Sequence, residues 1–457
     1  MRNAGLLLIA LGLAAGGCAP RGDEDRDAAA SHAASGSAAP ARAELPAEPT
    51  LADFLRLAAE RNPGVLAARQ RWLAARERAP QMRSLPDPQL MYEYWGLGEA
   101  EQQMLTASLT VPWPGKLTLA GRQAGEEARA EYQRYQSAGL ALAFRVKSAW
   151  FEHWYLARAI EIAGENAALA REIEEAVRTR YKAGVAEFSD VVKAQVELAR
   201  MEDMVKEFEQ MRSPIAARLN AELDRPSEAP LPAAPKTFPG ERLALPDAEV
   251  LSLLEKASPE LAAMDAEVAA ARHAVGLAKR GPIPDLMFKA GAMTMKAEGM
   301  DREDGPQLGV GITVPLWFGK YRAMRREAGA RLAAAELSRR DTANHLGSEV
   351  KMTLFSLRDA DRKVGLYLEA IIPRAEQAAA AALAGYRAGR VQFADLVDAE
   401  RVLIQFRLDY ARAVANRAQR LAELEMMVGR ALSAEADRPT TSPADAGDRG
   451  SQKEARP

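Results

Sequence analysis

The chain has 457 residues, of which 61 are Lys or Arg and 63 are Asp or Glu, so its formal net charge is −2 at pH 7. This balance excludes the strongly basic surface that is typical of a nucleic-acid-binding protein. Aromatic residues make up only 6% of the chain, and Ala, Glu, Arg and Leu dominate it, a composition typical of long helices and coiled coils. The length allows two or three ordinary domains with a large buried core.

The chain begins with a pattern typical of a bacterial secretory signal. Arg2 supplies a positive charge, residues 6–15 form an apolar run, and small residues precede Cys18, the only cysteine. The cysteine resembles that of a lipobox, whose thiol is acylated and becomes the mature N-terminus. The alternative is a plain signal peptide, or a short membrane anchor, with an incidental cysteine. We predict a signal peptide over residues 1–17 and a lipidated, flexible tether over 18–50.

Three further observations concern the membrane and the chain ends. Ala19 follows the cysteine in place of an aspartate that would resemble an inner-membrane retention signal, which favours the outer membrane. No other stretch reaches the roughly 18 consecutive apolar residues of a transmembrane helix. A membrane-spanning part would therefore consist of strands closed into a barrel. The tail at 433–457 is as poor in large apolar residues as the tether and is predicted to be disordered.

Between these ends, the chain consists of two copies of one unit. Four landmarks recur in one order, and their offset grows slowly from 259 − 63 = 196 to 386 − 181 = 205. This drift is expected of a duplication with a few loop insertions. The matched landmarks are Asn62-Pro63 with Ser258-Pro259, Leu85-Pro86-Asp87 with Ile283-Pro284-Asp285, Val111-Pro112 and Gly115-Lys116 with Val314-Pro315 and Gly319-Lys320, and Tyr181 to Gly184 with Tyr386 to Gly389. We predict a first repeat at 51–225, a proline-rich linker at 226–246 and a second repeat at 247–432.

Each repeat contains two predicted strands, at about 87–112 and about 285–315. In the second repeat, Leu308, Val310 and Ile312 alternate with glycines, and the same period of two runs from Leu105 to Val111 in the first. Such alternation marks a strand with two different faces. In a membrane barrel the apolar face meets lipid and the polar face lines the lumen; a soluble hairpin is the alternative.

Long helices surround the strands. Helical hairpins are predicted at about 117–223 and about 320–430. Residues 117–182 contain no proline and would form a helix of roughly 100 Å at about 1.5 Å per residue. The first repeat is expected to open with one continuous helix at 51–83 and to end with another at 188–223. Helices of this length without a globular core pack as coiled coils.

The paired Val-Pro…Gly-Lys strand exits and the two Tyr-x-Ala-Gly…Asp turns resemble those of the TolC-type outer-membrane factor family, in its lipoprotein branch from tripartite RND-type efflux systems. The resemblance covers residues 51–430. It implies a mainly α fold with a membrane β-barrel, in which each protomer of a homotrimer gives four strands to a twelve-stranded barrel and two hairpins to a periplasmic coiled-coil barrel. It also implies a periplasmic adaptor (membrane fusion) protein and an inner-membrane RND-type pump as partners.

The turns that end the long helices are the candidate functional segments. Gly184 and Gly389 are predicted to take the left-handed conformation that stops a helix. Asp190 and Asp395 follow in the first turn of the next helix, where the helix dipole favours negative charge. Capping and turn formation alone could account for these residues. The resemblance adds a second role, because it places both turns, with Tyr181 and Tyr386, at the periplasmic tip where the channel closes.

A carboxylate ring at this tip would attract cations and make opening sensitive to charge. Asp395 and Asp398 are three residues apart and share one helix face, whereas Lys193 stands at the position that matches Asp398. We therefore expect the second hairpin to contribute more of the gate. Some relatives carry a latching arginine two residues after the turn glycine; here that position is Val391, and Arg390 lies one residue earlier.

No cofactor, metal site or catalytic centre is expected. The four histidines are scattered without ligand spacing. Met293, Met295 and Met300 could bind a soft monovalent metal, but they are more simply explained as strand and loop residues among apolar neighbours. The sequence contains no Gly-x-Ser-x-Gly elbow, phosphate-binding glycine loop or His-Glu-x-x-His motif.

These patterns favour a passive trimeric duct in the outer membrane, anchored by lipid, that extends into the periplasm and conducts small molecules or metal ions. The sequence does not distinguish between these cargoes. The alternative is a periplasmic coiled-coil adaptor or an envelope scaffold lipoprotein. An adaptor would carry a compact β domain beside a single hairpin, whereas here strands lie between helices in both repeats.

Overall fold

A computed structural model of the chain describes residues 45–46, 48–97, 100–235, 243, 245–296 and 303–432. The predicted signal peptide at 1–17, the predicted anchor Cys18, most of the tether and the tail at 433–457 lie outside the described residues.

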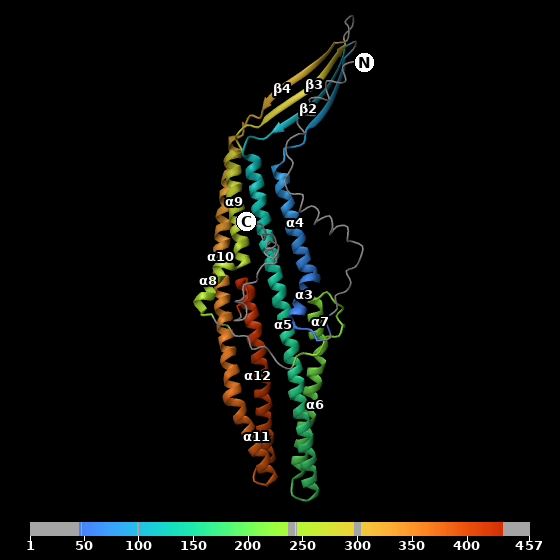
Figure 1. Cartoon of the computed structure of the whole chain (residues 1–457), viewed down its shortest axis with the longest axis vertical. Helices are drawn as coiled ribbons and strands as arrows, with labels where there is room; N and C mark the ends of the chain where they lie inside the picture. The colour runs from blue at the N-terminus through green and yellow to red at the C-terminus, as the bar shows by residue number, and fades with distance from the viewer. Residues whose placement is uncertain are drawn as a thin grey trace, which may run out of the picture. The chain divides into compact units, whose positions relative to one another are not determined.

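Helices lead into strands and strands lead back into helices, twice along the chain (Figure 1). The first repeat contains α3 (Leu51–Arg61), α4 (Pro63–Arg83), β1 (Gln89–Leu97), β2 (Ala100–Val111), α5 (Lys116–Lys182), α6 (Phe188–Gln210) and α7 (Arg212–Glu222). The second contains α8 (Asp247–Ala257), α9 (Pro259–Arg280), β3 (Leu286–Lys296), β4 (Glu303–Ile312), α10 (Phe318–Leu366), the π-helical turn η1 (Tyr367–Ile371), α11 (Ile372–Arg387) and α12 (Phe393–Val428). None of the described helices is long and apolar enough to cross a membrane.

The expectation of one opening helix over 51–83 is wrong, because the helix is broken at Asn62. The Asn62 side chain accepts hydrogen bonds from the backbone N–H groups of Gly64 (3.0 Å) and Val65 (3.3 Å). It therefore caps a new helix, in which Pro63 takes the first position, where its missing N–H costs nothing. The Asn62 amide also donates to the carbonyl of Glu222 (3.1 Å), which fixes the start of α4 against the end of α7.

Two more helices depart from the expected continuity. The return helix at 188–223 is interrupted at Met211, between α6 and α7. In the second repeat, the five residues of η1 separate α10 from α11, which begins one residue before Pro373. Proline has no N–H to donate to the preceding turn and its ring crowds that carbonyl, so a local π-helical turn accommodates it.

The four strands form one antiparallel sheet in the order β1-β2-β3-β4. The register brings Leu90, Ala107, Ala290 and Leu308 side by side across the sheet. On this face the side chains of β4 are open to solvent, with Leu308 85% exposed. The opposite face carries polar groups and glycines together with every methionine of the strands: Met91, Met104, Met287, Met293 and Met295.

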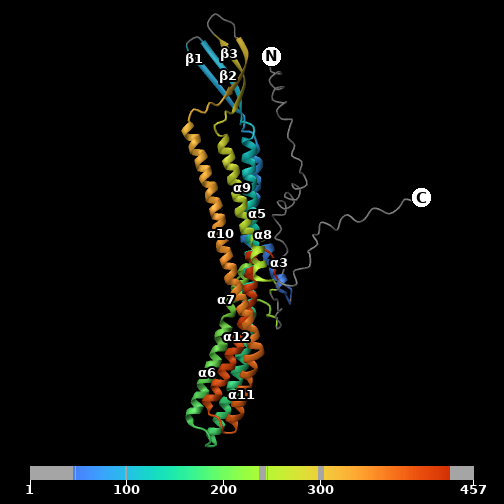
Figure 2. The same ribbon diagram turned by 90° about the vertical axis from the view of Figure 1, so that its left-hand side faces the viewer.

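The helices pack around α5, which contacts α4, α6, α9 and α12. Its buried face is rich in alanine, including Ala149, Ala159 and Ala163, and small side chains let neighbouring helices approach closely. Larger residues form a core where α8, α10 and α12 meet, around Val350 and Leu424. Figure 2 shows α6, α11 and α12 gathered at the end of the helices that lies away from the strands.

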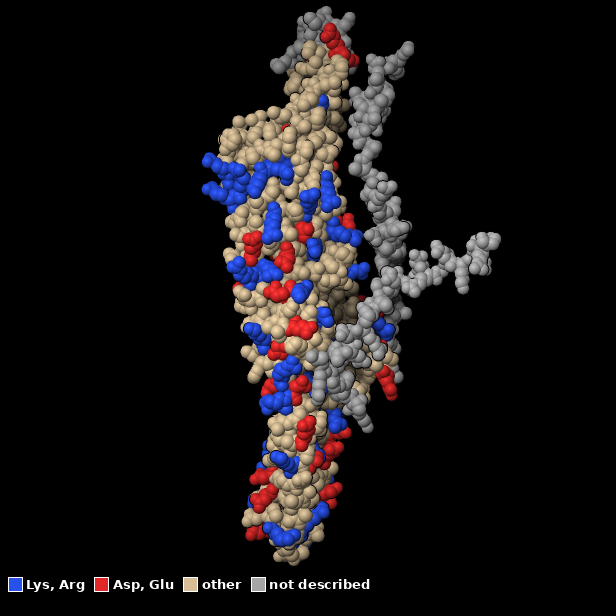
Figure 3. Space-filling model, turned by 60° about the vertical axis from the view of Figure 1, so that its left-hand side comes forward, with Lys and Arg blue, Asp and Glu red and all other residues tan. Residues whose placement is uncertain are grey.

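One ion pair joins the two repeats where the strands give way to the helices. Lys116, the first residue of α5, lies 2.8 Å from Oδ1 of Asp285, just before β3, and also donates to the carbonyl of Ile283 (2.7 Å). The same Oδ1 accepts a hydrogen bond from the backbone N–H of Trp113 (2.8 Å). We call these contacts the junction. In Figure 3, Lys and Arg side chains gather on the helices just beyond the strands, whose own surface is mostly uncharged.

The break at Asn62 can be tested by Asn62→Ala. This substitution removes the cap of α4 and leaves the Glu222 carbonyl without that donor, so the free energy of unfolding should fall by about 1–2 kcal/mol. Ser258 occupies the matching position of the second repeat. In the described part of the chain its buried hydroxyl makes no hydrogen bond, so Ser258→Ala is the matched control. Thermal unfolding followed by circular dichroism should separate the variants; equal losses would contradict the capping role.

Candidate functional site

Both hairpins turn on a glycine with the same backbone conformation. Gly184 and Gly389 each have a φ of +71°. The N–H of Gly184 donates to Tyr181 O (2.9 Å) and that of the next residue donates to Arg180 O (2.9 Å); Gly389 and its successor repeat this pattern. These two hydrogen bonds close the helix end in a Schellman motif, which requires a residue in the left-handed conformation. The structure therefore accounts for both turn glycines by helix termination.

An aromatic pair lies beside each turn, but the two pairs have different surroundings. Tyr181 packs on Phe188 and Tyr386 packs on Phe393, with ring centroids 5.8 Å apart in both cases. Tyr181 is 44% exposed, whereas Tyr386 is 7% exposed. The second tip thus buries a tyrosine that the first tip leaves at the surface.

Tyr386 packs in an apolar cluster with Val177, Val191 and Leu396, and Arg180, which sequence reasoning missed, also contacts it. The Arg180 guanidinium lies 4.7 Å from the Tyr386 ring centroid and donates to the Tyr386 carbonyl. The matching residue of the second repeat is Gly385, where a Cβ would lie 2.4 Å from Val391 Cγ2. Burial raises the pKa of Tyr386; Arg180 acts in the opposite direction and Asp190 adds to the rise. The structure thus brings Tyr386 and Asp190 into electrostatic range of each other.

The three candidate aspartates lie near the tips in different settings. Asp190 is partly buried and pairs with Lys193 at 4.0 Å within its own helix. Asp395 is exposed in the first turn of α12. Asp398 is exposed one turn later, 3.8 Å from Arg401.

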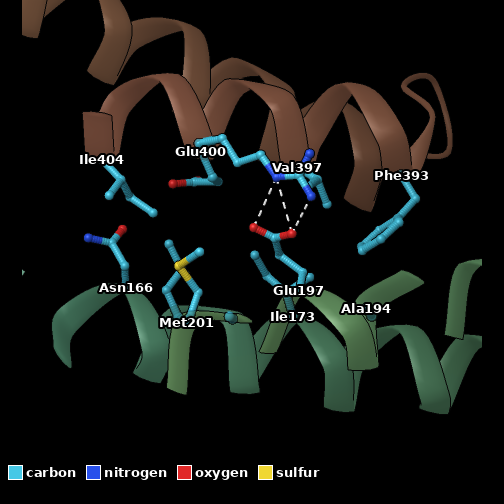
Figure 4. A pocket seen from close by; sticks show the side chains of 12 residues that line it. Asn166, Ile173, Ala194, Glu197, Met201, Phe393, Val397, Glu400 and Ile404 are labelled. Atoms are coloured by element: carbon cyan, nitrogen blue, oxygen red, sulfur yellow. Dashed lines mark hydrogen bonds and ion pairs between the residues drawn. The ribbon is translucent and has the colours of Figure 1, made fainter. Parts of the chain in front are cut away.

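A second contact missed from the sequence joins the two hairpins directly. Nε of Arg401 on α12 donates to both carboxylate oxygens of Glu197 on α6, at 3.0 and 3.1 Å, and its Nη2 also donates to Oε2 (Figure 4). Glu197 is largely buried, and a bidentate pair of this kind is stronger and more directional than a single contact. Its signal in the sequence is weak, because the two residues are 204 positions apart.

Two hollows lie beside this ion pair. A groove of about 240 Å³ runs between α6 and α12, and its lining residues are Val192, Lys193, Val196, Phe393, Ala394, Val397, Asp398 and Arg401. A smaller cavity, of about 30 Å³, shares Phe393, Val397 and Arg401 with the groove, and Glu400 faces it together with Asn166 and Met201 (Figure 4). Burial raises the pKa of Glu400, and Arg407 opposes this effect.

No group of three or more His, Cys, Asp or Glu side chains that could hold a metal ion occurs among the described residues. Of the methionines considered from the sequence, Met293 accepts a hydrogen bond from the Gln102 amide at 2.9 Å, and Met300 lies outside the described residues.

The model of a family described as outer membrane efflux protein matches residues 54–221 and 250–430 of the chain. The chain belongs to this family. Membership confirms the predicted family and the function as the outer-membrane duct of an efflux system, and it decides against the alternative of a periplasmic adaptor. The family is one of efflux ducts and not of enzymes.

Individual relatives are similar to this chain in length and fold. The cobalt-zinc-cadmium resistance protein CzcC of Cupriavidus metallidurans is 24% identical over 400 residues, which cover 83% of this chain and 90% of CzcC. The outer membrane protein VceC of Vibrio cholerae has a TM-score of 0.71 at 18% identity, covering 84% of this chain and 96% of VceC. CusC, solved in a study of transmembrane channel formation, has a TM-score of 0.74 at 16% identity, covering 83% of this chain and 92% of CusC.

The setting of Glu400 predicts a pH-dependent effect of Glu400→Gln. A raised pKa means that the folded protein disfavours the charged form, so stability present at low pH is lost as the pH rises through the raised value. The amide should therefore raise the free energy of unfolding near neutral pH by roughly 0.5 kcal/mol and give no gain below about pH 4, where the wild-type carboxyl is protonated. Thermal unfolding at both pH values is the measurement, and Glu175→Gln, at an exposed site on α5, is the control. An equal gain at both pH values would contradict this account.

Proposed function

We propose that three copies of the chain assemble into one continuous duct, with a twelve-stranded barrel in the outer membrane and a helical barrel in the periplasm. The observation that carries this proposal is the incomplete sheet. Strands β1 and β4 are its edges, and one of its faces exposes large apolar side chains, including Leu90 and Leu308. An open edge is not tolerated in lipid, because each unpaired backbone group there costs several kcal/mol.

The number of strands supports assembly from several copies. A barrel of about eight strands is only wide enough to be filled by its own side chains, so four strands from one chain cannot enclose a pore. Twelve strands from three copies would leave a lumen. Thr106, Lys289 and Gln307 lie on the face that would line it.

At the tips, the proposal assigns two roles. The Asp395 and Asp398 carboxylates would form a ring at the periplasmic entrance, with Asp190 and Tyr386 packed behind them. The groove between α6 and α12 would receive a helical tip of the periplasmic adaptor, because its apolar floor of Val192, Val196 and Val397 is bordered by charged groups. Amphipathic helices bind grooves of this composition. The adaptor would in turn join the duct to an inner-membrane RND-type pump.

Metal cations are the cargo that we favour. CzcC is named a cobalt-zinc-cadmium resistance protein, and a ring of exposed carboxylates at the entrance would raise the local concentration of cations. Growth of a deletion strain on zinc, cobalt and cadmium salts, compared with growth on organic antibiotics, tests the cargo separately from the duct. Acylation of Cys18 would hold the chain in the outer membrane, and the mass of the mature N-terminal peptide tests it.

The assembly itself is tested by isolating the full-length protein from the outer-membrane fraction. We expect a species of three copies that withstands detergent at room temperature and separates into single chains on heating. A water-soluble single chain would contradict the proposal.

The gate is tested with Asp395→Asn combined with Asp398→Asn. Removing both carboxylates should lower the permeability of cations relative to anions by roughly twofold or more and should weaken block by polyvalent cations. Single-channel recording in planar bilayers is the measurement. Asp341→Asn with Glu327→Gln, which removes two charges from α10 away from the tips, is the control. Unchanged selectivity in the tip variant would contradict a carboxylate gate.

A further inference from the structure

Because the chain is duplicated, the residues of the junction occur twice in the sequence. Within a single copy, only one of the two sets forms its Lys–Asp ion pair. In the complete junction, Lys116 of the first repeat binds Asp285 of the second. The Lys116 side chain is 14% exposed and that of Asp285 is 26% exposed. The backbone N–H of Asp285 is bound as well, to Thr313 Oγ1 at 2.8 Å, so the acceptor is held in one orientation.

The residues that match this pair are Lys320 and Asp87, and they do not meet within the chain. Both are exposed. Among the described residues, neither makes an ion pair, and the Nζ of Lys320 lies 5.8 Å from the ring centroid of Tyr321. Lys320 stands in the first turn of α10 with no acidic residue beside it. A cation there opposes the helix dipole, so an anionic partner would offset a cost that the single copy leaves uncompensated.

The same comparison predicts how the two sheet edges would pair. Within the chain, Val111 of β2 lies opposite Leu286 of β3. In the aligned repeats, Val111 corresponds to Val314, which lies beyond the end of β4. Leu286 corresponds to Pro88, which lies just before β1. Antiparallel pairing from that point sets Ile312 opposite Leu90, Val310 opposite Tyr92 and Leu308 opposite Tyr94.

The exposure of the side chains on the apolar face also supports this register. All six of these side chains belong to the apolar face, and each is more than half exposed in one copy, from 52% for Tyr94 to 85% for Leu308. A shift of one residue would turn one strand's apolar side chains to the opposite face. The pairing therefore extends the apolar face without interruption from one copy to the next.

We propose that Lys320 of one copy binds Asp87 of the next, in the manner in which Lys116 binds Asp285 within the chain, and that β4 pairs with β1 of that neighbour in the register given above. The occupant of both open edges is thus a second copy of this chain. The second strand exit is one residue longer than the first, and the flexible stem of lysine can span this difference. The inference rests on the proposed assembly and adds the residues that close it.

A charge-swap experiment tests the ion pair. Lys320→Asp and Asp87→Lys should each speed dissociation of the heat-resistant oligomer by roughly tenfold, because like charges would then face each other at a site that the assembly partly buries. The double variant with both changes should restore most of the loss, since the pair is re-formed with opposite polarity. Arg331→Asp, which breaks an exposed pair with Glu327 inside α10, is the control and should leave the rate unchanged.

Disulfide formation tests the register independently of charge. Tyr92→Cys combined with Val310→Cys, in a chain that is otherwise wild type, should give a cross-link between copies on mild oxidation of the assembly in membranes. The control, Met91→Cys with Val310→Cys, places the two thiols on opposite faces and should give none. This second measurement remains informative even if the charge-reversed single variants fail to fold.

Three results would overturn the inference: wild-type dissociation rates in both single variants, no rescue in the double variant, or cross-linking of the control pair in place of the predicted one. Each is distinguishable from failure of the proposed function. If the wild-type protein forms conducting oligomers but the variants show no coupling, only the proposed contacts are refuted. If the wild-type protein forms no oligomers, the proposed assembly itself is refuted.

Discussion

A backbone N–H or C=O group that enters lipid must have a hydrogen-bond partner, and the sheet of this protein cannot provide one along its two edges. Among the strands that the structure describes, β1 and β4 each have one neighbour. The helices, the apolar sheet face and the family membership are all consistent with a protomer that is complete only next to further copies of itself. The exposure of Leu308, Val310 and Ile312 on β4 fits the same constraint, because in the proposed assembly these side chains would face lipid.

The two repeats share one fold and differ in how their hairpins are held. Arg180 and Arg401 each reach from one hairpin to the other, to Tyr386 and to Glu197 respectively. Neither contact has a counterpart in the other repeat, since Gly385 matches Arg180 and Val196 matches Arg401. The second tip buries its tyrosine, whereas the first leaves Tyr181 exposed, and it also carries the exposed Asp395 and Asp398. Separating the hairpins at this end would have to break a bidentate ion pair.

Local and periodic features could be predicted from the sequence. The alternation from Leu308 to Ile312 predicted a strand, and a glycine before a polar segment predicted the turns at Gly184 and Gly389, because these features depend on backbone conformation within a few residues. The same reasoning missed the break at Asn62, although Asn followed by Pro is a recognisable start of a helix. Helical periodicity continues through this site, so the pattern of apolar residues does not mark the break.

Contacts between distant segments were beyond the reach of the sequence. Lys116 and Asp285 both belong to repeated motifs of the sequence, yet only the sheet register brings them together. The Arg401–Glu197 pair depends on which faces of α6 and α12 meet, and each helix carries several charged residues that could serve equally well. The roles of Cys18, Asp190, Asp395 and Asp398 remain predictions of the sequence and the family, since packing within one copy does not decide them.

Amide hydrogen exchange of the purified, full-length protein in lipid tests the central claim most directly, because it reports on the backbone groups that the single chain leaves unpaired. If copies close the sheet, the amides of β1 and β4 should be protected as strongly as those of β2 and β3. Exchange in β1 and β4 that is orders of magnitude faster than in the two central strands would mean that the edges stay open, and would contradict the account.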